Sequence, residues 1–272
     1  MLILKTIKHS TVWGGHLYSL YCRKGISNEI LNGEWKGKCL NDVFPLFKAD
    51  FNFSRYEYFP LTLALTDACQ NLSIQVHPDK RESWYFIKAP HSGVIFNGCT
   101  CCDKAEAELM IRKGQFLEMV DMLPVKVGDY VFVEPGTLHA ITAGSLVYEI
   151  EEGSDYTYRF YDYDRIDANG KKRELHLEKA TNALNIRLKS KAQTYDGKAI
   201  QEKTYSTRLI TNTAKYTNES STIECFTFVK GSLFCQNLQI AAGSSILLWP
   251  SETLDTCQIE LAFVSKKLEG NL

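Results

Sequence analysis

The chain alternates between short apolar or aromatic runs and turn residues, and this pattern restricts it to folds built from many short strands. The segment Leu61–His77 reads LTLALTDACQNLSIQVH, in which two apolar runs flank Asp67 and Asn71. Two strands joined by a turn give this pattern. The aromatic and β-branched run SWYFIK at Ser83–Lys88 is again typical of a strand. Many such strands at close spacing indicate a sandwich or barrel.

Two segments favour helices instead. Asp103 can cap a helix with an acidic first turn, and Gly114 divides the region 103–122 into two short helices. Residues 176–188 are predicted to form one more helix. From Tyr205 to Val264 the chain is strand-like again, after a polar linker at about 189–203. We therefore expect a mainly β chain with an N-terminal domain, 1–188, and a linker with a C-terminal lobe, 189–272.

Composition excludes several classes of partner. The 272 residues are 44% hydrophobic and 23% charged, with a formal net charge of -1. This balance gives no reason to expect nucleic acid or an anionic membrane as partner. The first apolar run ends at Lys5, which is too short for a signal peptide, and no apolar stretch is long enough to span a membrane. A cytoplasmic location is the expectation.

The cysteines include one cluster, Cys99, Cys101 and Cys102. Three thiols this close invite a metal interpretation, but no second cysteine pair stands at zinc-finger spacing and the nearest histidine, His91, is isolated. Reduced thiols in or beside a strand, in a reducing compartment, are the alternative that the spacing favours.

The first residues that could carry chemistry are Gln75 and His77. Residues two apart on a strand point to the same face, so these two side chains project together while Val76 packs on the other face. Pro78 ends the strand. Taken alone, a histidine near a glutamine on a strand is more often a satisfied polar pair than a metal site.

Glu82 and His139 extend the set. Glu82 opens the next aromatic strand, and His139 follows the Pro135-Gly136 turn. Imidazole nitrogens with a carboxylate oxygen make an ordinary zinc set that leaves positions open for water or substrate, and Gln75 could add an amide oxygen. Composition alone does not bring these residues together.

Three motifs give the chain a resemblance. LSIQVHPDK at 72–80, VEPGTLHAI at 133–141 and YEIEEGSDYTYRFYDYDR at 148–165 occur in this order. Together they resemble the signatures of the type I mannose-6-phosphate isomerases of the cupin superfamily. The resemblance implies a cupin-type jelly-roll β-barrel with a second, degenerate C-terminal cupin lobe.

The same resemblance implies roles for single residues. One Zn²⁺ per chain is expected, with Arg159 as a catalytic residue and Glu149 in proton transfer. Arg159 could instead be a surface strand residue, and Glu149 one member of a solvated acidic run with Glu151 and Glu152. The positions that match the family's zinc ligands are Gln75, His77, Glu82 and His139.

The chain also departs from the family pattern. Ala64 stands where relatives carry a lysine that would hold the substrate phosphate, and the loop after Asp79 is short. Lys80 and Arg81 are the candidates to supply substrate-binding cations instead.

The function implied is a zinc-dependent aldose–ketose isomerase that interconverts mannose 6-phosphate and fructose 6-phosphate, as a monomer or homodimer. Two alternatives stay open. One is a non-catalytic or divergent metal-binding cupin that senses a sugar or sugar phosphate. The other is an iron dioxygenase, since two histidines and a carboxylate also suit ferrous iron.

Overall fold

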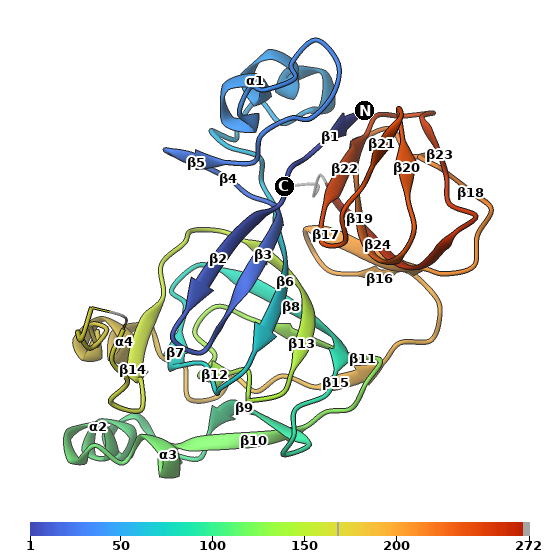
Figure 1. The fold of residues 1–272 in the computed structure, drawn as a ribbon. Coiled ribbons are helices and arrows are strands. Elements are labelled where there is room, and N and C mark those ends of the chain that lie inside the picture. The colour runs from blue at the N-terminus through green and yellow to red at the C-terminus, as the bar shows by residue number, and fades with distance from the viewer. Residues whose placement is uncertain (168, 269–272) are drawn as a thin grey trace. The chain divides into compact units, whose positions relative to one another are not determined.

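The structure is a computed structural model that describes residues 1–167 and 169–268, and most of its regular elements are strands (Figure 1). The chain divides into two compact units, which are named here by their place in the sequence. The terminal unit comprises Met1–Lys8, Leu17–Ala64 and Asp196–Leu272, and the central unit comprises His9–His16 and Leu65–Tyr195. The prediction of a mainly β chain with two β lobes and a few short helices is confirmed.

Two sheets supply the strands of the central unit. The first has seven strands, of which β2, β3 and β6 continue along the chain into the terminal unit. Its order is β15 (Ala192–Thr194), β11 (Asp129–Val133), β8 (Arg81–Lys88), β13 (Leu146–Glu152), β6 (Thr62–Ala68), β3 (Gly14–Leu20) and β2 (Ile7–Thr11). The second has five, in the order β10 (Val120–Pro124), β9 (Val94–Cys99), β12 (His139–Ala140), β7 (Ile74–Val76) and β14 (Tyr158–Tyr161).

Strand alternation divides the apolar residues of the central unit into two cores. One lies between the sheets, where Trp84 and Phe86 of β8 pack with Ile95 and Ala140 of the five-stranded sheet. The other covers the opposite face of the five-stranded sheet and contains Ile74 and Val76 of β7. Its remaining members include residues of the short helices α2 (Lys104–Lys113), α3 (Phe116–Met119) and α4 (Leu177–Ala183). Gln75 is thereby turned away from the helices, as the alternation predicted.

The helix signals around Asp103 and Gly114 are confirmed. Asp103 is the N-cap of α2, and its side chain accepts a hydrogen bond from the backbone N–H of Glu106 at 2.9 Å. Gly114 ends the helix in the left-handed conformation at φ +70°, which costs glycine no steric clash.

Two predicted helices are shorter than the pattern indicated. The segment after Met119 leaves the helix and forms β10, because Met122 and Leu123 pair with β9. The predicted helix over 176–188 ends with α4 at Ala183. Beyond it, the Asn185 N–H donates to the carbonyl of Gly136 at 2.9 Å, so a long-range backbone bond replaces the next helical turn.

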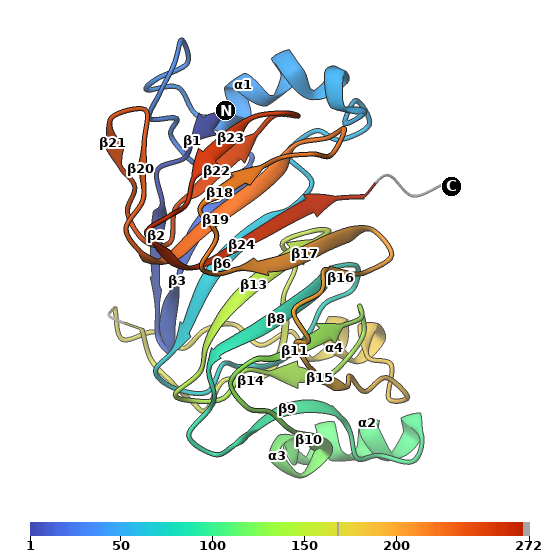
Figure 2. The ribbon, with the colours of Figure 1, turned by 90° about the vertical axis from the view of Figure 1, so that its right-hand side faces the viewer.

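The terminal unit is built around a six-stranded antiparallel sheet (Figure 2). Its apolar residues, among them Ile210, Phe226, Leu248 and Val264, form one buried core. The unit also contains the helices α1 (Leu40–Phe47) and η1 (Lys48–Phe51) and three two-stranded ladders. The ladders are β4–β5 (Cys22–Arg23, Ile26–Ser27), β18–β23 (Lys215–Thr217, Thr253–Asp255) and β20–β21 (Phe234–Cys235, Leu238–Gln239). The sheet order is β1 (Leu2–Ile3), β22 (Ser245–Leu248), β19 (Glu224–Gly231), β24 (Ile259–Lys267), β17 (Tyr205–Ile210) and β16 (Ile200–Gln201).

The predicted domain boundary after residue 188 stays a prediction, and its last four residues, 269–272, lie outside the described part of the chain. Within residues 1–167 and 169–268, no helix has the length and apolar character needed to cross a membrane. In the same ranges, no group of side chains positioned to share a metal ion includes Cys99, Cys101 or Cys102, and all three thiols are free.

The cap of α2 provides a test of the fold. Replacing Asp103 with alanine removes the acceptor for the Glu106 N–H and should lower the free energy of unfolding by about 1 kcal/mol. Asp103→Asn keeps an acceptor oxygen and should stay within a few tenths of the parent value. Urea denaturation of the three proteins measures the difference. Equal stability of the alanine variant would mean that the cap contributes nothing.

Candidate metal centre

His77 is aimed by the strand that precedes it. Ile74 and Val76 of β7 are buried among the helices, so Gln75 and His77 face the seven-stranded sheet. His77 is only 1% exposed, and its backbone carbonyl accepts the Gly136 N–H at 2.8 Å. Gly136 adopts φ +87°, a left-handed conformation that suits glycine in the turn before His139.

His139 and Arg159 flank Gln75 on neighbouring strands. In the ladders of the five-stranded sheet, His139 of β12 is paired with Gln75, and Gln75 with Arg159 of β14. Directly paired residues of antiparallel strands share a face. The three side chains therefore form a row across three strands that come from distant parts of the sequence.

Glu82 reaches the histidines from the other sheet. Its Oε1 lies 3.0 Å from His77 Nε2, and its Oε2 lies 3.5 Å from His139 Nε2. The three residues offer ligand atoms that all lie within 4.8 Å of one another, and all three are buried. The two histidines and the carboxylate that the sequence suggested are thus brought together.

The outer nitrogens of both histidines are held by backbone carbonyls. His77 Nδ1 lies 2.7 Å from the Tyr156 carbonyl oxygen, and His139 Nδ1 lies 2.8 Å from that of Thr137. A carbonyl only accepts, so each Nδ1 carries a proton and each Nε2 is the nitrogen that faces the Glu82 carboxylate. Burial lowers the pKa of His139 to about 4, which keeps it neutral. Two imidazole nitrogens and a carboxylate fit a divalent cation such as zinc.

Gln75 lies beside this set. Its Nε2 is 3.4 Å from Nε2 of both His77 and His139, while Ser73 Oγ donates to its Oε1 at 2.9 Å. Rotation of the amide about its last bond would exchange the nitrogen and the oxygen. Ser73 Oγ, which can also accept, would then receive the amide N–H, and the amide oxygen would face the histidines.

Lys80 neutralises the carboxylates at the centre. Its Nζ lies 2.7 Å from Glu82 Oε1 and 3.0 Å from Glu151 Oε1, and the residue is only 6% exposed. Burial alone would lower the pKa of Lys80, but Glu151 and Glu82 outweigh it and hold the pKa above its usual value. Burial would likewise raise the pKa of Glu82, yet Lys80 and His77 hold it well below the usual range.

The end of β13 keeps Lys80 in place through Gly153. This glycine adopts φ +125°, and a Cβ added there would lie 2.5 Å from the carbonyl oxygen of Asp79 and 2.8 Å from the Cα of Lys80. No L side chain fits so close to a backbone.

Glu149 is a buried carboxyl held by two donors. Trp84 Nε1 donates to its Oε1 at 3.0 Å, and the Thr66 hydroxyl donates to its Oε2. Burial raises the pKa of Glu149 to about 8, and the negative charges of Glu82 and Glu151 add to the effect. The interpretation of Glu149 as a solvated surface acid does not fit its 4% exposure.

His16 is a site residue that the sequence reasoning missed. Its Nδ1 lies 2.8 Å from Thr66 Oγ1 and 3.6 Å from Glu149 Oε2, and burial lowers its pKa to about 3. The only signal was its position in β3 two residues after Gly14, on the same face as that glycine. Which strand β3 pairs with decides the contact, and the sequence did not give this pairing.

Arg159 is half-buried and is not engaged by the acids that follow it. Asp162 is bound by Arg165 and Arg173 instead. The Nε atom of Arg159 is buried and has no hydrogen-bond partner among the described residues. Burial lowers the pKa of Arg159 from its usual value, and the charge of Arg173 adds to this.

Arg81 is not brought into the cluster. It precedes Glu82 in β8 and therefore points to the other face of the sheet. There its guanidinium lies 4.0 Å from Glu134 and 3.8 Å from Glu152. Of the two cations suggested for substrate binding, only Lys80 lies beside the cluster.

Removing either histidine should abolish metal binding. We expect His77→Ala and His139→Ala to bind Zn²⁺ about 100-fold more weakly or worse, because each removes a ligand from a buried set. Titration against a coloured chelator and elemental analysis after dialysis measure this. The exposed His91 provides the matched control, His91→Ala, which should bind as the parent does. Unchanged affinity in His77→Ala would rule out the cluster.

The pKa of Glu149 predicts a pH-dependent stability for the metal-free protein. An unfolded glutamate titrates near 4.5, so between pH 4.5 and 8 the folded chain retains a proton that the unfolded chain has lost. The free energy of unfolding then falls as pH rises, by at most about 1.4 kcal/mol per pH unit from this group. Glu149→Gln should remove that part of the slope. Urea denaturation in chelator at pH 6, 7 and 8 tests this, and equal slopes would contradict it.

Four curated proteins are similar to this chain. The chain is 33% identical over 214 residues to the mannose-6-phosphate isomerase of Streptococcus mutans, which covers 68% of each chain. It is 35% identical over 185 residues to mannose-6-phosphate isomerase ManA of Bacillus subtilis, which covers 63% of this chain and 59% of that protein. The chain spans between 54% and 68% of the length of the four curated relatives it matches. No family model matches it.

A solved structure extends the likeness to nearly the whole chain. The crystal structure of the mannose 6-phosphate isomerase from Bacillus subtilis superposes with a TM-score of 0.83 at 26% identity. The match covers 97% of this chain and 99% of the solved one. Since the Streptococcus mutans relative is similar over two thirds of its length, the chain belongs to the mannose-6-phosphate isomerase family.

Proposed function

We propose that the protein interconverts mannose 6-phosphate and fructose 6-phosphate, with one Zn²⁺ held by His77, Glu82, His139 and Gln75. The proposal is carried by one observation, which is that two imidazoles and a carboxylate converge in a member of this family. A divalent cation bound there would act as a Lewis acid on a sugar oxygen.

Glu149 is proposed to move the proton. An aldose–ketose isomerisation takes a proton from one of the carbons C1 and C2 and returns it to the other. A carboxyl group serves best when its pKa lies near the working pH, and burial raises the pKa of Glu149 to about 8. Trp84 and Thr66 fix the carboxyl group in one orientation, so it need not reorganise during the transfer.

Arg159 and Lys80 are proposed to stabilise the negative charge that develops on the sugar oxygens. Arg159 shares a face with Gln75, and a ligand oxygen could accept the hydrogen bond of its buried Nε. Lys80 supplies the buried positive charge nearest to Glu82. Arg81, on the other face of β8, is left without support as a substrate-binding residue.

The isomerase assay tests these roles. In zinc-loaded protein, Glu149→Gln should lower kcat by at least about 100-fold, which is within the range for loss of an acid–base group. Arg159→Lys keeps the charge but loses the planar fork and should lower kcat by about 10-fold or more. Zinc content should stay at the parent level in both variants. Conversion of mannose 6-phosphate to fructose 6-phosphate is followed with a coupled enzyme.

Matched controls lie on the exposed face of α2. Glu108→Gln and Arg112→Lys make the same chemical changes at an exposed ion pair and should leave kcat unchanged. Parent-like turnover in Glu149→Gln would remove Glu149 from the mechanism. If the protein binds zinc and mannose 6-phosphate without turning the sugar over, the non-catalytic sensor becomes the better description.

A further inference from the structure

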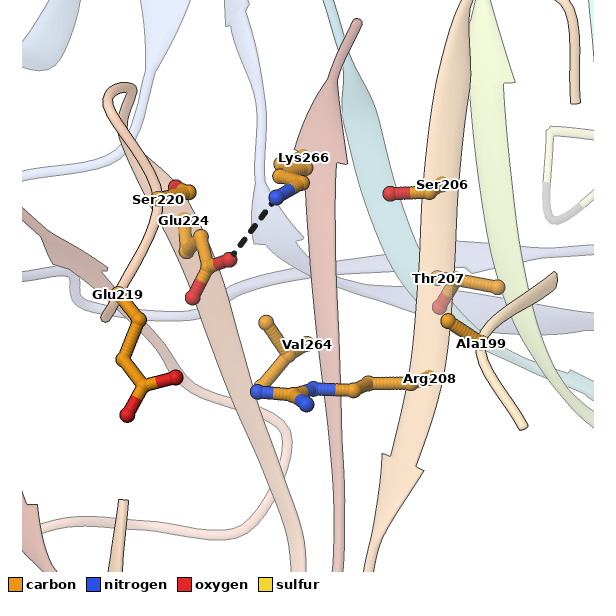
Figure 3. Close-up of a pocket in the computed structure, with 9 residues that line it drawn as sticks. All are labelled: Ala199, Ser206, Thr207, Arg208, Glu219, Ser220, Glu224, Val264 and Lys266. Carbon is orange, nitrogen blue, oxygen red and sulfur yellow. Dashed lines mark hydrogen bonds and ion pairs between the residues drawn. The ribbon is translucent and has the colours of Figure 1, made fainter. Parts of the chain in front are cut away.

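The terminal unit has a polar pocket of about 260 Å³, and Figure 3 shows the side chains that line it. Two cations, Arg208 and Lys266, are among them. Two acids, Glu219 and Glu224, are among them as well, so the formal charges of the lining cancel. Lys266 is directed at Glu224, with its Nζ 3.4 Å from Glu224 Oε1. The pocket therefore favours neither an anion nor a cation as its ligand.

The carboxyl group of Glu149 in the central unit has a more definite environment, because a chain of hydrogen bonds ends on it. His16 Nδ1 lies 2.8 Å from Thr66 Oγ1, and the Thr66 hydroxyl donates to Glu149 Oε2. Trp84 Nε1 donates to the other carboxyl oxygen, Oε1, at 3.0 Å. His16, Thr66 and Glu149 come from β3, β6 and β13, which are adjacent strands of the seven-stranded sheet. Both oxygens of the buried Glu149 thus face a donor.

The direction of each hydrogen bond follows from the number of protons available. A carboxylate only accepts, and a threonine hydroxyl has a single proton to donate. When Glu149 is ionised, as a base must be before it takes a proton, the Thr66 proton lies on the Glu149 side. Thr66 Oγ1 can then only accept from His16, so Nδ1 of His16 is a donor. Burial lowers the pKa of His16 to about 3, and the ring therefore donates this hydrogen bond as a neutral group.

A neutral donor can orient a base without weakening it. A cation in the place of His16 would stabilise the ionised carboxylate and lower the pKa of Glu149. Lys80 already supplies a buried cation, which is held by Glu82 and Glu151. The His16 Nδ1 also lies 3.6 Å from Glu149 Oε2, so the ring occupies the space beside this oxygen.

The backbone holds His16 in register with Thr66. Gly14, two residues earlier, adopts φ +142°, and a Cβ added there would lie 2.0 Å from the carbonyl oxygen of Asp67. No L side chain fits so close to a backbone, so this approach of β3 to β6 requires glycine. The ring of Trp13 packs edge-on against that of His16, with the ring centres 5.0 Å apart. Both contacts fix the position of the His16 ring beside Thr66.

We propose that His16 is a positioning residue of the isomerase, which donates its Nδ1–H to Thr66 and so directs the Thr66 hydroxyl proton at Glu149. With Trp84 on the other oxygen, the ionised base is held in one orientation before the sugar binds. His16 keeps its own proton throughout and acts only through Thr66. This role rests on the proposed function, because it concerns the carboxyl group to which proton transfer is assigned.

A double-mutant cycle tests whether His16 acts through Thr66. Steady-state conversion of mannose 6-phosphate is measured on the zinc-loaded parent, His16→Ala, Thr66→Val and the double variant. Each single change should lower kcat by about tenfold or more and leave KM within about twofold, because it misplaces the base but not the sugar. The double variant should stay within about twofold of Thr66→Val, since nothing is left for His16 to orient. Losses that multiply in the double variant, or a KM that rises while kcat is kept, would overturn the role.

Conservative variants separate the hydrogen bonds from the packing of the side chains. Thr66→Ser keeps the hydroxyl and His16→Asn keeps an N–H near the position of Nδ1, so both should recover kcat to within about threefold of the parent. Thr194→Val is the matched control, because Thr194 also donates to a buried carboxylate of the same sheet, Asp129 Oδ1, at 2.8 Å. It should keep the parent kcat although it loses the same kind of hydrogen bond. An equal drop in kcat for Thr194→Val and Thr66→Val would mean general destabilisation of the sheet and would contradict the proposal.

The tautomer of His16 gives a readout that needs no turnover. Nitrogen NMR of the isotope-labelled, metal-free full chain distinguishes a protonated from a bare Nδ1, and the spectrum of His16→Asn identifies the His16 signals. At about pH 9.5, above the pKa of about 8 of Glu149, we expect His16 to be neutral with its proton on Nδ1. A bare Nδ1 under these conditions would overturn the proposal even in an active enzyme. An inactive parent with Nδ1 protonated would refute the proposed function, and with it the role of His16, while the direction of the hydrogen bonds would stand.

Discussion

Three carboxyl groups and one ammonium group share the interior between the sheets of the central unit. The balance of their charges determines which of the carboxyl groups is protonated. Lys80 pairs with Glu82 and Glu151, and Glu149 lies beside them. One cation cannot neutralise three buried carboxylates, so the metal-free protein keeps Glu149 protonated near neutral pH. A divalent cation beside Glu82 would supply the missing positive charge and let Glu149 ionise. Metal binding and the ionisation of Glu149 are therefore linked through electrostatics.

Local patterns in the sequence were enough to predict part of the fold and part of the site. The alternation in Ile74–His77 determined which side chains share a face, and Asp103 and Gly114 marked the ends of α2. In each case the relevant contact lies within one element, so nearby residues decide it. Predictions from local pattern failed where a residue distant in the sequence competed for a backbone hydrogen bond. The carbonyl of Gly136 accepts the N–H of Asn185, and α4 therefore ends before the predicted residue 188.

The convergence of the site could not be derived from local pattern. Glu82 meets His77 and His139 only because two sheets face each other, and the family resemblance, not the spacing, suggested that set. His16, Thr66 and Trp84 were missed as partners of Glu149 because their contacts depend on strand pairing across the seven-stranded sheet. Lys80 and Arg81 are both cations, so both were candidates for substrate binding. The alternation of β8 turns Arg81 to the face away from the cluster.

Gly153 links two parts of the chain that are far apart in the sequence. Because the backbone of Asp79 and Lys80 rests directly on this glycine, a side chain at position 153 would displace the residue that neutralises Glu82. A longer connection between β7 and β8 could bend away and relieve that restriction. Loop length after His77 and the residue at position 153 should therefore covary among homologues, with short loops requiring glycine and long ones tolerating larger side chains.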